Sequence, residues 1–173
     1  MAVDAGFYVP PEDLQIDPTL RLSSDFEDDI DAITYEVIRH NLWNINEEHG
    51  LTMANVSGSP VAVYAHDFNP SILTERGEFV YFGPYIQFFS GMTDLLVKWV
   101  LTNRSTNPGI NEGDMFLSND PMIGTHHQSD VFLLCPVFWE GELFSWTANA
   151  LHQYDIGGNT PGSFCVDARD VFD

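Results

Sequence analysis

Three polar side chains in this sequence form a set that suits a divalent metal ion. His127, Asp130 and His152 offer two imidazoles and a carboxylate, the donor types used for Zn, Mn and Fe. His127 and Asp130 lie three residues apart, a spacing that fits a loop or turn, because strand residues three apart face opposite sides. Twenty-five residues separate the two histidines, so the fold must bring them together.

Three further acidic residues are candidates for the same site. Asp67 comes from an earlier segment and is a candidate oxygen ligand. Asp120 and Asp155 are candidate catalytic or orienting acids, because a ligating histidine usually donates its other ring N–H to a carboxylate or carbonyl. The residue types alone leave open an acid–base cluster without metal and a buried polar network.

The other histidines are expected to play different roles. We expect His126 not to ligate, and His40 and His49 to be structural or solvated. The Gly-rich loop 155–162 contains glycines that permit positive φ. It could form a phosphate nest, although the chain has no GxxxxGK[ST] motif.

A β-hairpin is the element predicted to join the two histidines. Residues 131–139 and 143–151 are apolar, β-rich runs, and Glu140-Gly141 lies between them. Two such runs around a short Gly-containing turn are typical of a hairpin. Its open end then brings His127, Asp130 and His152 together.

The register decides which way the ligand side chains point. A simple two-residue turn pairs Ser129 with His152 and Asp130 with Leu151, which puts Asp130 and His152 on opposite faces. Pro136 cannot donate to a ladder and marks an edge or a bulge. A bulge would shift the register by one residue and could put both side chains on one face.

Apolar periodicity predicts two helices, at residues 29–49 and 92–102. Asp28, Asp29 and Asp31 favour the start of the first helix, and Gly50 suits its C-cap. The first helix has an apolar stripe that comprises Ile30, Ile33, Val37, Ile38, Leu42 and Ile45.

The remaining segments complete an α+β fold. Residues 51–89 are predicted to be β-structure with a turn at 75–78, and residues 115–117 a short strand. We expect an antiparallel or mixed sheet containing the 131–151 hairpin, with amphipathic helices packed on one face. Residues 1–28 read as an acidic extended arm or linker, and residues 29–173 as the metal-binding domain.

Composition excludes several classes of partner. The formal charge is −20, with six lysines and arginines in 173 residues. Nucleic acids and anionic membranes need basic patches, so neither is expected as a partner. Cys135 and Cys165 form no CxxC pair, and no signal peptide or transmembrane run is visible. We therefore expect a cytoplasmic protein.

A longer motif string resembles the hydantoinase B family. It runs through Asn119-Asp120-Pro121, Gly124-Thr125, His127, Asp130-Val131, His152, Asp155-Ile156-Gly157-Gly158 and Thr160-Pro161-Gly162. The resemblance extends from about Asp31 to the end, and Ser59-Pro60, Asp67-Phe68 and Gly77 fall at the family's early spacing. Family members are much longer, which implies that the chain is a fragment or a split part of a subunit. His126-His127 stands where most members have one histidine, and Ser129 replaces a common proline.

The resemblance implies a function in a multi-subunit ATP-dependent enzyme. In this family a hydantoinase A-type partner binds ATP-Mg and activates a carbonyl by phosphorylation, and the B-type subunit holds Mn or Zn. His127, Asp130 and His152 match the family's proposed metal ligands, and Asp67 matches an early acidic position.

The leading hypothesis is a ketone carboxylase of the acetone or acetophenone type, with further carboxylase subunits. It joins an activated enolate to CO₂ or bicarbonate. The alternatives are an ATP-dependent cyclic amide hydrolase of the hydantoinase or 5-oxoprolinase type and a non-catalytic assembly subunit. An Fe(II) oxygenase with two histidines and one carboxylate shares the ligand types but has no place for the Asp-Ile-Gly-Gly loop.

Overall fold

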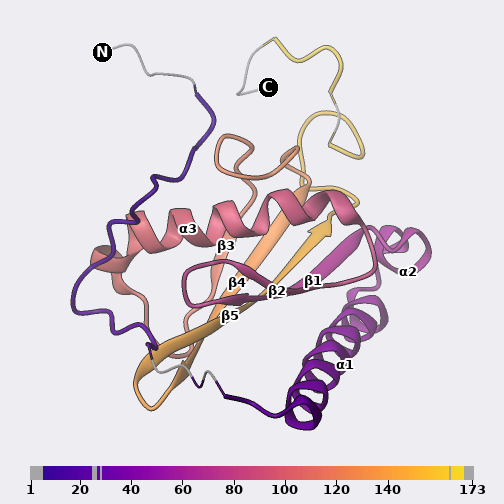
Figure 1. Cartoon of the computed structure of the whole chain (residues 1–173). Helices are drawn as coiled ribbons and strands as arrows, with labels where there is room; N and C mark the ends of the chain where they lie inside the picture. The colour runs from indigo at the N-terminus through magenta and orange to yellow at the C-terminus, as the bar shows by residue number, and fades with distance from the viewer. Residues whose placement is uncertain (1–5, 25–26, 28, 164, 170–173) are drawn as a thin grey trace.

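A five-stranded antiparallel sheet forms the centre of the protein (Figure 1), in the order β2-β1-β5-β4-β3. The computed structural model describes residues 6–24, 27, 29–163 and 165–169. The strands are β1 (Phe68–Thr74), β2 (Phe79–Phe82), β3 (Phe116–Ser118), β4 (Asp130–Trp139) and β5 (Glu142–His152). The helices are α1 (Ala32–Ser57), α2 (Pro60–Ala65) and α3 (Thr93–Arg104), with short turns η1 (Gln87–Gly91) and η2 (Ser105–Gly109). The predicted α+β class is confirmed.

Helix α3 packs on one face of the sheet and closes the hydrophobic core. It buries a stripe at helical spacing: Leu96, Val97, Val100 and Leu101. From the sheet, the same core takes Phe132, Leu134, Trp146, Ala148 and Ala150. The predicted helix at 92–102 is therefore confirmed, and its apolar stripe is covered by β4 and β5.

Helix α1 lies against the opposite face. Successive strand residues point to opposite sides of a sheet, so Asn149 points away from its core-facing neighbours Ala148 and Ala150. The Asn149 side-chain amide lies 3.3 Å from Nε2 of His49 on α1. The prediction that the helices pack on one face is therefore wrong for α1.

The first helix is longer than its sequence pattern indicates. Asp31 is the N-cap and accepts from the amides of Ile33 and Thr34, while the helix continues to Ser57 and ends at Gly58 in the left-handed region. The prediction of Gly50 as the C-cap is wrong. Gly50 lies inside α1 and is buried. The Tyr85 ring packs so closely against it that a Cβ at residue 50 would lie 2.4 Å from the ring.

The segment predicted as β-structure is helical in its first half. Pro60 starts α2 at a position where its missing N–H is not needed, and the alternating Val61 and Val63 lie within that helix. Strands occupy only Phe68–Thr74 and Phe79–Phe82 of this stretch. The predicted turn at 75–78 joins them, and the short strand predicted at 115–117 is β3.

The N-terminal segment lies along its own domain. Leu14, Ile16, Leu20 and Leu22 contact the core, and Ser23 N donates to Leu143 O at 2.9 Å. Residues 1–5, 25, 26 and 28, including the helix-favouring role assigned to Asp28, lie outside the described residues. Within the described part of the chain, no helix combines the length and apolar character needed to cross a membrane.

Candidate metal centre

A β-bulge in the predicted hairpin sets the direction of the ligand side chains. Trp139 pairs with Glu142 as predicted, but the register shifts by one between Val137 and Phe138. From there to the open end, Asp130 pairs with His152 rather than with Leu151. Directly opposed residues point to the same face, so both side chains lie on the face that α3 covers.

The three predicted ligands converge at the end of β4 and β5. His152 Nδ1 lies 2.9 Å from Asp130 Oδ1, and His127 Nδ1 lies 3.1 Å from Asp130 Oδ2. Each of the three residues offers one potential ligand atom, and these three atoms all lie within 4.8 Å of one another. The two imidazole rings meet edge to face, with centroids 4.9 Å apart.

A tight turn delivers His127 to this position. Asp130 N donates to His127 O at 3.0 Å, which folds the chain back just before β4 begins. Gln153 N donates to Ser129 O at 2.7 Å, and the Asn119 side-chain amide donates to Gln128 O at 2.9 Å. Sequence reasoning did not assign Asn119 this role, although its Asn-Asp-Pro motif marked the segment.

Asp67 lies beside the triad, immediately before β1, the strand that pairs with β5. His152 N donates to Asp67 O at 3.0 Å, just before β1 begins. Burial raises the pKa of Asp67; nearby His152 and His127 act in the opposite direction, and Asp130 reinforces the increase. Its Oδ1 atom is buried and accepts no hydrogen bond. Its role as a ligand remains a prediction.

The burial of the acids fits a bound cation. Asp130 has no exposed side-chain surface, and its Oδ2 atom accepts no hydrogen bond. In the described part of the chain, its ion pairs are with the two histidines and with no lysine or arginine. A buried carboxylate needs a paired charge or a metal. The two nitrogen–oxygen distances are those of direct contacts between Asp130 and each imidazole, and a bound cation would replace these contacts.

The two predicted catalytic acids lie in turns of their own. Asp120 Oδ1 accepts from Met122 N at 2.9 Å. The Asp155 carboxylate accepts from the amides of Gly162 and Gly157 and from the Ser163 hydroxyl, and these hydrogen bonds lower its pKa. Neither acid belongs to the metal-ligand group, and their catalytic roles remain predictions.

The remaining candidates are placed as follows. The amides of Gly157 and Gly162, which a phosphate nest would use, already donate to Asp155. His126 contacts the Phe88 ring edge to face at 4.7 Å and lies outside the ligand group. Of the two adjacent histidines, His127 is therefore the one that faces Asp130.

Comparison with known proteins gives a family match over most of the chain. Residues 31–173 match the profile of the hydantoinase B/oxoprolinase family. The caprolactamase subunit beta of Pseudomonas jessenii is 32% identical over 143 residues, covering 83% of this chain and 24% of that subunit. The acetone carboxylase alpha subunit of Xanthobacter autotrophicus is 29% identical, covering 66% of this chain and 15% of that subunit.

Solved structures agree with the sequence matches. Nucleotide-free acetone carboxylase superposes with a TM-score of 0.72 at 27% identity, covering 76% of this chain and 17% of that chain. ATP-dependent caprolactamase from Pseudomonas jessenii gives 0.65 at 29% identity, covering 77% and 23%. The chain thus spans about a quarter or less of the length of these relatives.

Proposed function

Because the chain belongs to the hydantoinase B/oxoprolinase family, we propose that it is the metal-bearing part of an ATP-dependent enzyme acting on an activated carbonyl compound. The observation that carries this proposal is the convergence of His127, Asp130 and His152. The Asp130 carboxylate lies 2.9 Å from Nδ1 of His152 and 3.1 Å from Nδ1 of His127. These three residues would hold a Mn or Zn ion, with Asp67 as a fourth, oxygen ligand.

The residues around the triad suit a reaction that develops negative charge on oxygen. A divalent cation held there supplies Lewis-acid stabilisation of an enolate or carboxylate oxygen. Asp130 is fully buried and lies next to Nδ1 of both imidazoles, so the three side chains are positioned to share one ion. His127 is 37% exposed while His152 is 16% exposed, so substrate reaches the centre from the His127 side.

The leading proposal for the reaction is ketone carboxylation. Acetone carboxylase is the solved structure with the higher TM-score of the two, at 0.72. In this scheme a hydantoinase A-type subunit uses ATP-Mg to activate a small ketone, and this chain's site holds the resulting enolate for CO₂ or bicarbonate. Further carboxylase subunits complete the complex.

Cyclic amide hydrolysis is the second proposal. The caprolactamase subunit beta is 32% identical to this chain, a higher identity than that of the acetone carboxylase subunit. The metal ion held by the same triad would then polarise the carbonyl of the activated ring for attack by water. The two reactions share the site and the ATP-dependent partner and differ in whether bicarbonate or water is consumed.

Metal binding is tested on the 173-residue chain by titration with Mn²⁺ and Zn²⁺ and by elemental analysis after dialysis. We expect one ion per chain in the wild type and loss of that ion in His127→Ala. His40→Ala is the matched control, because His40 is exposed on α1 and pairs only loosely with Glu36 at 3.7 Å. Stoichiometric metal retained in His127→Ala, with circular dichroism unchanged, contradicts the assignment.

The choice of reaction is tested after assembly with an A-type ATPase subunit. ATP hydrolysis that requires bicarbonate and acetone or acetophenone supports the carboxylase. Ring opening of a hydantoin, 5-oxoproline or caprolactam without bicarbonate supports the hydrolase. Full activity of a complex that contains the His127→Ala chain would instead indicate a non-catalytic assembly role.

A further inference from the structure

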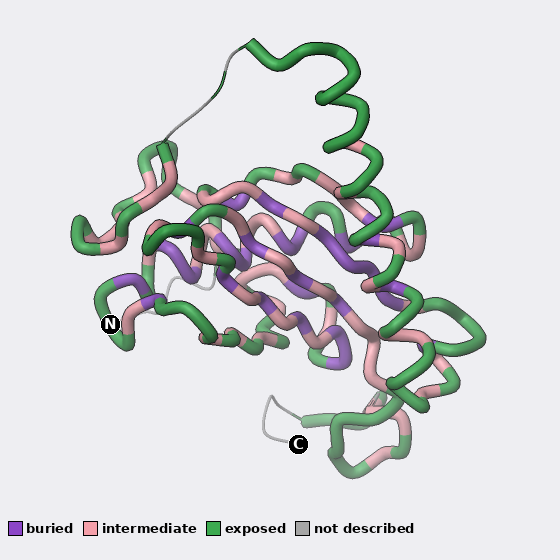
Figure 2. Tube along the Cα trace, turned by 90° about the horizontal axis from the view of Figure 1, so that it is seen from below, coloured by how far each residue is buried: buried purple, intermediate pink, exposed green. Residues whose placement is uncertain are grey.

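Helix α1 leaves most of its large apolar side chains exposed. Along its 26 residues only Asn46 and Gly50 are buried. Figure 2 shows most of the helix trace as exposed. The exposed apolar side chains include Ile33 (78%), Val37 (55%), Ile38 (45%), Ile45 (56%), Leu51 (56%) and Val56 (76%).

These residues lie on one side of the helix, with polar residues such as Asn41 and Glu48 between them. At about 100° per residue, Ile33, Val37, Ile38, Ile45 and Leu51 fall within about 140° of one another around the helix axis. We call the six residues just given, Ile33 to Val56, the apolar arc. It lies away from the side that Asn46 and Gly50 present to the sheet. Several large apolar side chains exposed on one side of a helix favour an interaction site there.

A shallow hollow along the start of α1 has only one wall. It measures about 500 Å³ and is lined by Ala32, Ile33, Glu36, Val37, His40 and Asn41, which all belong to α1. Every residue that lines it belongs to α1, so the hollow is an open stretch of helix surface.

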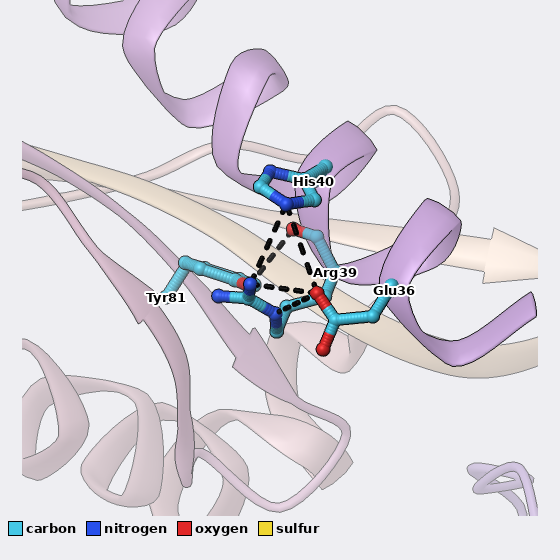
Figure 3. A network of polar contacts seen from close by, with 4 residues as sticks. All are labelled: Glu36, Arg39, His40 and Tyr81. Carbon is cyan, nitrogen blue, oxygen red and sulfur yellow. Dashed lines mark hydrogen bonds and ion pairs between the residues drawn. The ribbon is translucent and has the colours of Figure 1, made fainter. Parts of the chain in front are cut away.

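One polar contact joins the first half of α1 to β2, and neighbouring ion pairs lie within the helix itself (Figure 3). The Tyr81 hydroxyl on β2 donates to Arg39 O at 2.8 Å. Arg39 Nη2 donates to Glu36 at 2.7 Å, and His40 lies 3.7 Å from the same carboxylate. The apolar arc is therefore presented at a set angle to the sheet rather than at a frayed helix end.

Further along the helix, two contacts continue this anchoring. The Asn46 side-chain amide reaches Pro70 O at 3.4 Å, and Gly50 fits against the Tyr85 ring. These contacts are polar or steric and use none of the apolar arc. The domain thus fixes α1 without covering its apolar residues.

The charge of α1 favours a protein over a lipid surface as the occupant. Helices that lie on membranes carry several lysines and arginines beside the apolar face. Helix α1 has one such residue, Arg39, together with Glu36, Glu47 and Glu48. An acidic helix of this composition is repelled by anionic lipid.

The length of the relatives indicates which protein segment covers the apolar arc. The family profile covers residues 31–173, so it includes all of α1. This chain nevertheless spans only 24% of the caprolactamase subunit beta, which leaves most of that subunit unaccounted for. We propose that the apolar arc of α1 docks against the part of a hydantoinase B-type subunit that lies beyond the region this chain matches. The proposal depends on family membership and not on the metal centre.

Reconstitution in two pieces tests the proposal. The 173-residue chain is co-expressed with the Pseudomonas jessenii caprolactamase subunit beta from which the region matched by this chain has been removed. Three versions of the chain are compared: wild type, Ile33→Asp/Ile45→Asp, and the control Val9→Asp/Trp139→Asp. The control adds the same charge at apolar residues that are 80% and 68% exposed but lie outside α1.

We expect wild type and control to form a 1:1 complex and the α1 variant to lose at least about tenfold in affinity, as expected when central apolar contacts are replaced by charge. The proposal is overturned by no complex with the wild type, or by equal affinities for all three chains. It is also overturned if the α1 substitutions abolish only self-association, measured by sedimentation of the chain alone, or binding to neutral or anionic vesicles.

Two further readouts keep the result interpretable. Thermal unfolding of each chain alone checks that the substitutions leave the domain folded, which the exposure of both residues predicts. Zinc content is measured in the same samples. A complex that forms normally around a chain that binds no zinc would contradict the proposed metal function and leave the docking inference standing.

Discussion

Helices α1 and α3 both show apolar periodicity in the sequence, yet the structure treats them in opposite ways. Helix α3 buries Leu96, Val97 and Leu101 to 1% exposure or less against β4 and β5. Helix α1 leaves Ile33 78% exposed and contacts the sheet through Asn46 and His49. The difference shows that an apolar stripe in the sequence predicts an amphipathic helix. It does not identify the segment that packs against the apolar face.

The same contrast separates the two faces of the sheet. The face under α3 contains the core and, at its end, the proposed metal-binding triad His127, Asp130 and His152. In this half of the domain the apolar side chains are covered by α3, and a bound cation would neutralise the buried carboxylate. The α1 half is a surface built for another protein segment. Mutations in the two halves should therefore have very different effects on the isolated chain.

The largest expected difference is between Leu101→Ala and Ile33→Ala. Leu101 has no exposed surface, so truncation should lower the free energy of unfolding by about 2–5 kcal/mol. Ile33 is 78% exposed, so its truncation should change that free energy by less than about 0.5 kcal/mol. Urea unfolding of the isolated chain measures both. Similar losses for the two variants would show that α1 is part of the core.

A smaller effect is expected from Gly50→Ala, which tests how closely α1 approaches the sheet side. The new methyl would lie 2.4 Å from the Tyr85 ring. Displacing that ring should cost more than the helix-propensity gain of about 1 kcal/mol, giving a net loss of about 1 kcal/mol. The exposed Asn44→Ala on the same helix is the control. Stabilisation by Gly50→Ala would mean that α1 does not sit against Tyr85.

The smallest expected effect is a pH dependence from His49. Burial lowers the pKa of His49 in the folded state, so the unfolded chain binds more protons once the pH falls to about 6.5. Its contribution to stability is therefore present above that pH and is lost as the pH falls through the folded-state pKa. His49→Gln should be less sensitive than wild type between pH 8 and 5, measured by urea unfolding in the presence of a chelator. Identical pH profiles would contradict a partly buried, neutral imidazole.

The sequence predicted the convergence of the three candidate ligands more completely than it predicted the helices. The turn at Gly141 and the apolar runs around it were sufficient to bring His127, Asp130 and His152 to one place. They could not place the bulge, because it lies between Val137 and Phe138, where no glycine marks it. Pro136 signalled an irregularity nearby but not the residue at which the register shifts.

For a similar reason, local sequence patterns could not predict the helix ends or the helical structure in residues 51–65. Gly50 suits a helix end in isolation, but in the structure it allows Tyr85 to approach α1. The alternation of Val61 and Val63 resembles a strand, whereas Pro60 favours a helix start. Tertiary contacts decide both cases, and single-residue preferences do not contain them.

The most direct test of the account is an anomalous-scattering map of crystals of the chain grown with Mn²⁺ or Zn²⁺. The account predicts one strong peak bonded to His127, Asp130 and His152 at about 2.0–2.2 Å, with Asp67 beside it. Contradiction would come from a map with no peak between these residues while Asp130 still contacts both imidazoles directly.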